Sequence, residues 1–146
     1  MTEDLQECRP TGNPEKQGRS GIGMPAMLHL EDFGDIIFAA YGEWPYHVGS
    51  SLMGTTWRDV DVRLILDDEK YASMGFGKPG EEHENARWVA HVKAFSLLGR
   101  QMTGLPIDFQ IQQQTYANEH FGHKEGQHRC RSSLIMGALR RQNWTK

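Results

Sequence analysis

The chain lacks several features that mark whole classes of protein. It has only two cysteines, Cys8 and Cys130, and they lie far apart, whereas a disulfide scaffold would need more. Its longest clean apolar run, Ile36 to Tyr41, is much shorter than the about 20 residues that a transmembrane helix needs. The N-terminal residues include acidic side chains and no apolar stretch, so we expect no signal peptide.

A dominant charge is missing as well. The 16 Lys and Arg residues nearly balance the 19 Asp and Glu residues, and the net charge is -3. No strong overall field therefore draws the chain toward nucleic acid or an acidic membrane. Apolar residues make up 38% of the 146 residues, which is polar for a globular domain without being a disordered composition. We expect one small, soluble, cytoplasmic domain.

Composition divides the chain into three parts. Residues 1–27 hold three prolines and four glycines without an apolar period, which predicts a disordered or extended N-terminal arm. An arm that becomes ordered on a partner is the alternative. Residues 28–114 carry the periodic patterns and form the predicted core, and residues 115–146 form a basic, His-rich C-terminal extension.

Hydrophobic spacing predicts helices and strands in alternation. Leu30 to Tyr41 has helical spacing and stops before Gly42. Glu81 to Met102 has the spacing of the longest helix, and Gly104 is its expected stop. Residues 67–80, with three glycines and a proline, are expected to be a loop. In the extension, only residues 132–141 have a helical pattern. Strands are predicted at 46–49, 59–66 and 107–111. This order predicts an α/β or α+β domain around a small sheet.

Acidic side chains stand out in two of the predicted strands. Asp59 and Asp61 are two residues apart in a strand, so both side chains leave the same face. Neighbouring ionised carboxylates repel each other, and a divalent cation removes that conflict. Oxygen ligands suit Mg²⁺, which takes one or two carboxylates plus substrate phosphates. Asp108, between Ile107 and Phe109, adds a third carboxylate that can face the other two if the strands pair.

A tight turn precedes these aspartates. Gly49 and Ser50 end a predicted strand, and glycine allows the backbone to approach a phosphate closely. The Ser50 hydroxyl and the backbone N–H groups can donate hydrogen bonds to phosphate oxygens. A phosphate cradle followed by a metal-binding pair forms a chemically coherent site.

The order of these residues resembles the signature of the nucleotidyltransferase superfamily, which has the polymerase-beta-like fold. The chain has Gly49-Ser50, a spacer of eight residues, and then Asp59-Val60-Asp61-Val62, with Ile107-Asp108-Phe109 on a later strand. The resemblance covers roughly residues 28–112, a size similar to that of the minimal nucleotidyltransferases. It implies an α+β fold in which helices flank a small mixed sheet.

The resemblance also implies a reaction. Enzymes of this family transfer a nucleoside monophosphate from a nucleoside triphosphate to an acceptor hydroxyl and release pyrophosphate. By similarity, Asp59 and Asp61 would hold two Mg²⁺ ions, and Asp108 would bind the catalytic metal and help to deprotonate the acceptor. Gly49 and Ser50 would hold the β- and γ-phosphates, and Ser51 is a further candidate to contact the nucleotide.

This chain departs from the family pattern in two ways. The family often has a basic residue after the Gly-Ser pair, where this chain has Ser51, Leu52 and Met53. Arg58 and Arg63 flank the aspartates and can contact phosphates instead, with ordinary surface charge as the alternative.

No large second domain is visible to hold an acceptor, so a homodimer or a partner protein is a candidate to complete the cleft. The acceptor stays open between a small molecule, a protein side chain and an RNA end.

The C-terminal extension supports other hypotheses. Four side chains of ligand types that suit Zn²⁺ fall within eleven residues, namely His120, His123, His128 and Cys130. The favoured interpretation is that these are polar side chains that bind no metal. From His120 to Lys146 the local net charge is near +5, which can attract phosphate, nucleotide or RNA. Two function classes therefore stand beside the enzyme. One is a catalytically silent binding or regulatory subunit of the same fold, and the other is a small nucleic-acid-binding protein.

Overall fold

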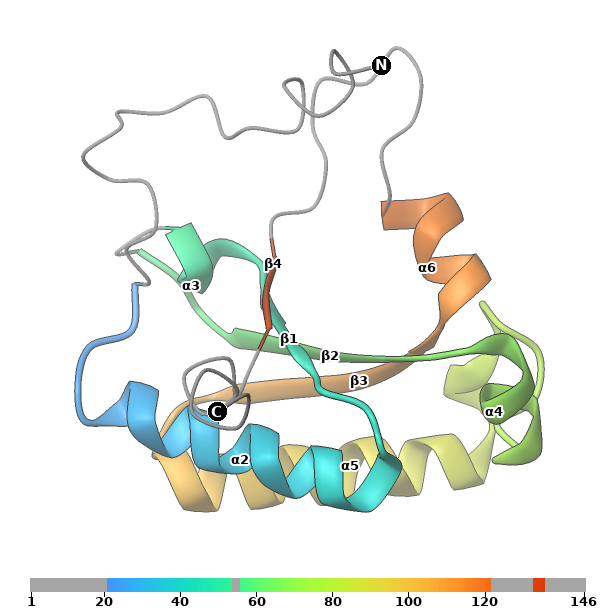
Figure 1. The fold of residues 1–146 in the computed structure, drawn as a ribbon, viewed down its shortest axis with the longest axis horizontal. Helices are drawn as coiled ribbons and strands as arrows, with labels where there is room; N and C mark the ends of the chain where they lie inside the picture. Colours follow the sequence, from blue (N-terminus) through green and yellow to red (C-terminus); the bar gives the residue numbers. More distant parts are fainter. Residues whose placement is uncertain (1–20, 54–55, 122–132, 136–146) are drawn as a thin grey trace, which may run out of the picture.

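The computed structural model describes residues 21–53, 56–121 and 133–135. Its strands form one sheet in the order β3-β2-β1-β4 (Figure 1). β1 is antiparallel to both β2 and β4, whereas β2 is parallel to β3. The strands are β1 (Tyr46–Val48), β2 (Val60–Leu66), β3 (Ile107–Gln113) and β4 (Ser133–Ile135). The expected α+β fold with a small mixed sheet is confirmed.

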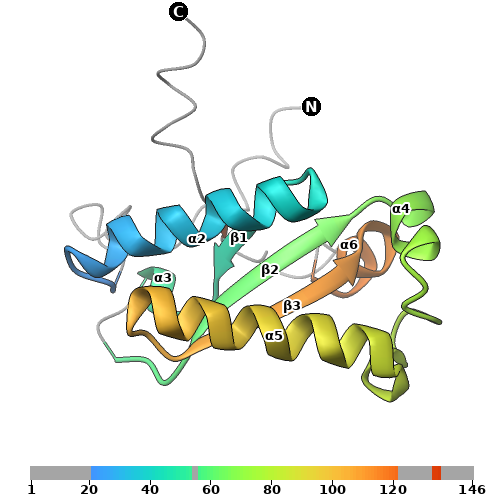
Figure 2. The same ribbon diagram turned by 90° about the horizontal axis from the view of Figure 1, so that it is seen from below.

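Two long helices cover one face of this sheet. α2 and α5 lie side by side beneath the strands in Figure 1, and in Figure 2 they lie in front of them. α3 and α6 lie on the other side of the sheet (Figure 1). The helices are α2 (Ala26–Tyr41), α3 (Ser50–Met53), α4 (Asp68–Ser73), the 3-10 helix η2 (Glu82–Glu84), α5 (Ala86–Thr103) and α6 (Gln114–Phe121).

The core lies between the two long helices and the sheet. Alternate residues of β2 and β3 are fully buried there, which confirms the predicted strand periodicity. Phe109 lies at the centre, and its ring meets Phe33 of α2 edge-on and Phe95 of α5 at a tilt, with ring centres 6.2 and 5.7 Å away. The buried strand residues are Val60, Val62, Leu64, Leu66, Ile107, Phe109 and Ile111.

Glycines and an asparagine set the ends of these helices. Gly42 and Gly104 adopt the left-handed conformation directly after α2 and α5, as the sequence predicts for both stops. The start of α5 differs from the prediction at Glu81. The Asn85 side chain accepts a hydrogen bond from the backbone N–H of Trp88 at 3.0 Å, so the helix begins at Ala86 and the preceding glutamates lie in or beside η2.

Other elements depart from the sequence-based expectation. The expected loop at 67–80 contains α4, because Asp67 caps the backbone N–H of Lys70 and Tyr71 is buried. α6 was not predicted. The helix predicted over 132–141 is wrong at Ser133–Ile135, which forms β4 against β1. A short apolar run does not distinguish a helix from a strand, and the edge of β1 that β2 leaves open provides a partner for β4.

The ordered fold extends beyond the predicted core. Ile22 is buried in the hydrophobic core and Met27 packs against it, so residues 21–27, expected in the arm, belong to the fold. At the other end, α6 and β4 come from the expected extension. The rest of the expected arm, residues 1–20, lies outside the described residues. Among the helices of the described part, none is long and apolar enough to cross a membrane.

The packing of Phe109 makes a prediction about stability. Phe109→Ala should lower the free energy of unfolding by about 3–5 kcal/mol, because it removes a fully buried ring and leaves a cavity between both helices and the sheet. Urea unfolding followed by circular dichroism measures the change. Leu97→Ala on the exposed side of α5 is the control and should stay within about 0.5 kcal/mol of the unsubstituted protein. Equal unfolding midpoints for the two variants would show that Phe109 does not hold the layers together.

Candidate functional site

The register of β2 and β3 brings two of the predicted acidic residues together. Asp61 lies directly beside Asp108, and Arg63 lies beside Gln110. Because side chains alternate along a strand, these four point away from α2 and α5, opposite to the buried residues between them. We call this the polar face of the sheet.

Arg63 joins the two carboxylates on this face. Its Nη2 donates to Asp108 Oδ2 at 3.2 Å and to Asp61 Oδ1 at 3.4 Å. Its Nη1 donates to the backbone carbonyl of Asp108 at 2.7 Å and to that of Val62 at 3.1 Å. The side chain is only 10% exposed. Arg63, expected as a phosphate contact, is therefore engaged inside the protein by two carboxylates and two carbonyls.

Gly49 lies against the same cluster of charges. It follows β1 with a φ of 81°, in the left-handed region that favours glycine. A Cβ atom at this position would lie 2.2 Å from Asp61 Oδ2, so any other residue here would force the Asp61 carboxylate to shift. The sequence suggested a glycine that lets a phosphate approach the backbone. In the structure, the group that approaches Gly49 is the carboxylate of Asp61.

A pocket opens beside this glycine. Its volume is about 450 Å³, and it collects four of the predicted site residues, which are Ser50, Arg58, Asp59 and Asp61, together with Thr56 and Trp57. Ser50, Arg58 and Asp59 are exposed, and Asp59 immediately precedes β2 instead of belonging to the strand. Asp108 is beside Asp61 but is not part of the pocket lining.

Ser51 has a different environment from Ser50. It is fully buried, and its hydroxyl lies 2.7 Å from His47 Nε2, so the hydroxyl expected to contact nucleotide is used inside the protein. His47 is also buried, and its Nδ1 makes no hydrogen bond with the described residues. Burial lowers the pKa of His47 from 6.5 to about 4, because the charged ring would lose its hydration.

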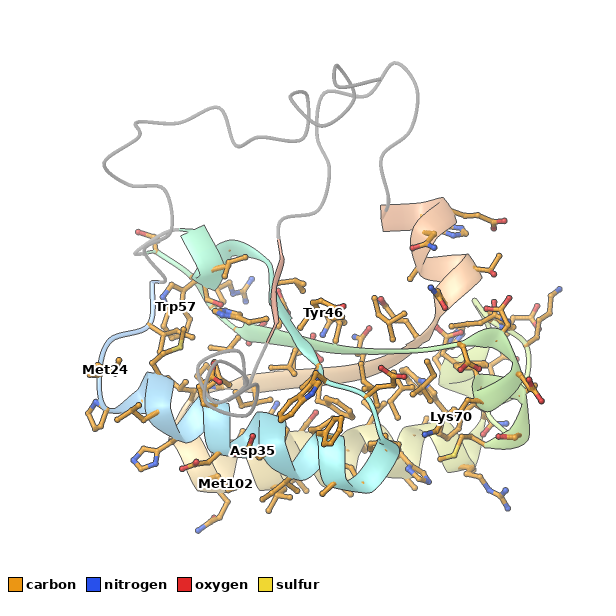
Figure 3. All side chains as sticks on the ribbon, viewed as in Figure 1. Met24, Asp35, Tyr46, Trp57, Lys70 and Met102 are labelled. Atoms are coloured by element: carbon orange, nitrogen blue, oxygen red, sulfur yellow. The ribbon has the colours of Figure 1, made fainter. Side chains whose placement is uncertain are left out.

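The pocket wall depends on a segment that the sequence did not connect with the site. The backbone N–H of Gly21 donates to the carbonyl of Ser51 at 2.8 Å, and the indole N–H of Trp57 donates to the carbonyl of Gly21 at 3.2 Å. Figure 3 shows Trp57 close to the start of α2. Trp57 also packs against the core, and it lines the pocket as well. No local pattern predicts such a contact between residues 36 positions apart.

The arrangement of the acidic side chains limits how a metal ion can be held. Within the described parts of the chain, no group of three or more His, Cys, Asp or Glu side chains is arranged to hold a metal ion. Asp59 and Asp61 do share the pocket, and two carboxylates suit Mg²⁺ when substrate phosphates supply further ligands. The donor set therefore fits an ion shared with a phosphate ligand better than an ion held by protein alone.

Most of the candidate zinc ligands of the extension lie outside the described residues. His120 belongs to α6, where its Nδ1 lies 2.9 Å from the carbonyl of Tyr116 and its ring stacks on the Tyr116 ring. His123, His128 and Cys130 lie outside the described residues, as does the basic segment that follows.

Comparison of the chain with protein-family models, with curated proteins and with solved structures gave no match in any of the three.

Burial of His47 makes a prediction about pH. Between pH 6.5 and about 4 the unfolded chain binds a proton at this histidine that the folded protein does not bind, so stability falls as the pH falls. The slope contributed by His47 should approach about 1.4 kcal/mol per pH unit. In His47→Gln, which can still hydrogen-bond Ser51, this contribution should be absent. Urea unfolding of both proteins across this range measures the difference, and parallel pH profiles would contradict the assignment.

Proposed function

We propose that the chain is a metal-dependent nucleotidyltransferase that moves a nucleoside monophosphate from a nucleoside triphosphate to an acceptor hydroxyl. The observation that carries the proposal is the convergence of the motif residues. One pocket is lined by Ser50, Arg58, Asp59 and Asp61. Asp108 is the direct neighbour of Asp61 on the next strand. The proximity of residues from three separate stretches of sequence supports the proposal.

The donors in the pocket suit a triphosphate. The exposed hydroxyl of Ser50 and the exposed guanidinium of Arg58 can both donate hydrogen bonds to phosphate oxygens. Arg58 has the planar geometry for two parallel hydrogen bonds to one phosphate. It would thus take the part of the basic residue that the family often has directly after its Gly-Ser pair.

The acidic side chains would supply the other half of the site. Asp59 and Asp61 are the residues that would hold Mg²⁺ together with the phosphates, and the ion would offset the charge that develops during transfer. Asp108 lies next to Asp61, where it could approach an acceptor hydroxyl from the side of β3. The acceptor can be a small molecule, a protein side chain or an RNA end under this proposal. A second copy of the chain or a partner protein would complete the cleft.

One observation favours a second candidate, the catalytically silent binding subunit. Arg63 neutralises Asp61 and Asp108 from within the protein, so two of the three motif carboxylates already have a cationic partner. A protein that binds nucleotide without turning it over would have this arrangement. The nucleic-acid-binding alternative depends on the basic extension, which lies outside the described residues.

Asp61→Asn tests the proposed enzyme. The change preserves shape and leaves an oxygen that can accept from Arg63, so the protein should fold. Transfer should fall by about 100-fold or more, because a ligand for the metal and its charge are both removed. The assay incubates the protein with Mg²⁺ and each α-labelled nucleoside triphosphate. Total RNA, a protein mixture and a small-molecule extract serve as acceptors, and transferred label is counted.

Glu69→Gln is the matched control, because it makes the same acid-to-amide change on an exposed residue of α4, beyond the far end of β2 from the pocket (Figure 1). It should transfer label as the unsubstituted protein does. Full activity in a clean Asp61→Asn preparation would overturn the proposed function. Binding of labelled triphosphate by the unsubstituted protein, with no product on any acceptor, would support the silent subunit instead.

A further inference from the structure

Arg63 is an unusual residue for the middle of a sheet. It is a permanent cation with a side chain only 10% exposed, and it lies between Asp61 and Asp108, whose side chains are 27% and 39% exposed. A buried charge is costly unless it is paired and hydrogen-bonded, and the guanidinium of Arg63 donates four hydrogen bonds, all to oxygen atoms. Its position therefore needs an explanation beyond packing.

The register of the sheet creates the need for this cation. Asp61 and Asp108 are direct neighbours on parallel strands, so without a counter-charge their ionised carboxylates would repel each other. Arg63 is two residues after Asp61, and side chains at that spacing leave the same face of the strand. Its guanidinium thus reaches both carboxylates at once, as a bridging metal ion would.

The guanidinium is also fixed in place. The two backbone carbonyls that accept from Nη1 orient the planar group, and one of them belongs to Asp108 on the neighbouring strand. The arginine side chain is a cation with donors only and no acceptor. A divalent cation approaching the Asp61–Asp108 pair would meet a permanent positive charge between its ligands.

We propose that Arg63 is a positioning residue that takes the place of a divalent cation between Asp61 and Asp108. In the protein without nucleotide, this pair of carboxylates does not bind a divalent cation. A second part of the proposal rests on the proposed function. The cation reaches Asp59 and Asp61 together with the triphosphate, and the phosphate oxygens complete the coordination of the cation. Removing the arginine turns the Asp61–Asp108 pair into a cation site that needs no nucleotide.

Mn²⁺ binding without nucleotide tests this role, with free Mn²⁺ measured by electron paramagnetic resonance. Arg63→Gln should bind Mn²⁺ at least about tenfold more tightly than the unsubstituted protein, because a unit charge a few ångströms from the ion is gone. Arg63→Lys, which retains the charge, should show no gain. Arg87→Gln, which removes an exposed arginine from α5 on the other side of the sheet, should show none either. The double variant Arg63→Gln/Asp108→Asn should lose the gain, because it has one carboxylate fewer.

Thermal unfolding provides a second measurement. Arg63→Gln removes the positive charge between two neighbouring carboxylates, so its Tm should be lower than that of the unsubstituted protein, and Mn²⁺ should raise it again. If this variant folds only when Mn²⁺ is present, that result also supports the proposal. A variant that stays unfolded in Mn²⁺, or that folds and binds Mn²⁺ no more tightly, would overturn it. The proposal would equally be overturned if the unsubstituted protein bound Mn²⁺ tightly without nucleotide and Asp61→Asn removed that binding.

The outcome separates the two proposals. A gain of Mn²⁺ binding in Arg63→Gln, with no label transfer by the unsubstituted protein, would support the role of Arg63 and count against the transferase. Label transfer by the unsubstituted protein, together with tight Mn²⁺ binding by the same protein without nucleotide that Asp61→Asn removes, would support the transferase and count against the role of Arg63. Equilibrium dialysis tests whether the cation and the triphosphate bind together. Labelled triphosphate should stay with the unsubstituted protein only when Mg²⁺ or Mn²⁺ is added. Retention without either ion would contradict joint binding.

Discussion

The parallel pairing of β2 with β3 is the constraint on which the rest of the structure depends. Parallel neighbours need a long crossover, and α4, η2 and α5 form it here. α5 returns across the sheet beside α2 and buries the apolar side of both strands (Figure 2). Because side chains alternate, the same pairing turns the other side of both strands toward the polar face. One backbone register thus builds the core and places Asp61 beside Asp108.

The polar face shows how the protein manages the charges that this register collects. Arg63 neutralises the two carboxylates, and Gly49 lacks the side chain that would collide with Asp61. The pocket lies beside this cluster, with Asp59 and Arg58 exposed at its wall. The site thus has two zones of different character, a neutralised pair on the sheet and a solvent-accessible pair of charges next to it. The exposed zone is the part available to a ligand from solution.

Much of the fold was predictable because it follows from local patterns. Alternation in β2 and β3 predicts both strands, and helical spacing followed by Gly42 or Gly104 predicts where α2 and α5 end. Prediction failed where a local pattern was weak or ambiguous. α4 depends on a cap at Asp67 and on burial of Tyr71, and the strand at Ser133–Ile135 depends on the available edge of β1. Neither condition is visible in a short window of sequence.

The amino-acid sequence alone determined which face of each strand is buried, and therefore that Asp61 and Asp108 both turn away from the core. Only the tertiary structure decided what those carboxylates meet. Arg63 contacts Asp108 across a separation of 45 residues, and Trp57 reaches Gly21 across 36. Ser51 lies only four residues from His47, yet its burial follows from how the chain packs around it. Periodicity reports the direction of a side chain relative to its own backbone, whereas its partners depend on which distant segments the fold brings into contact.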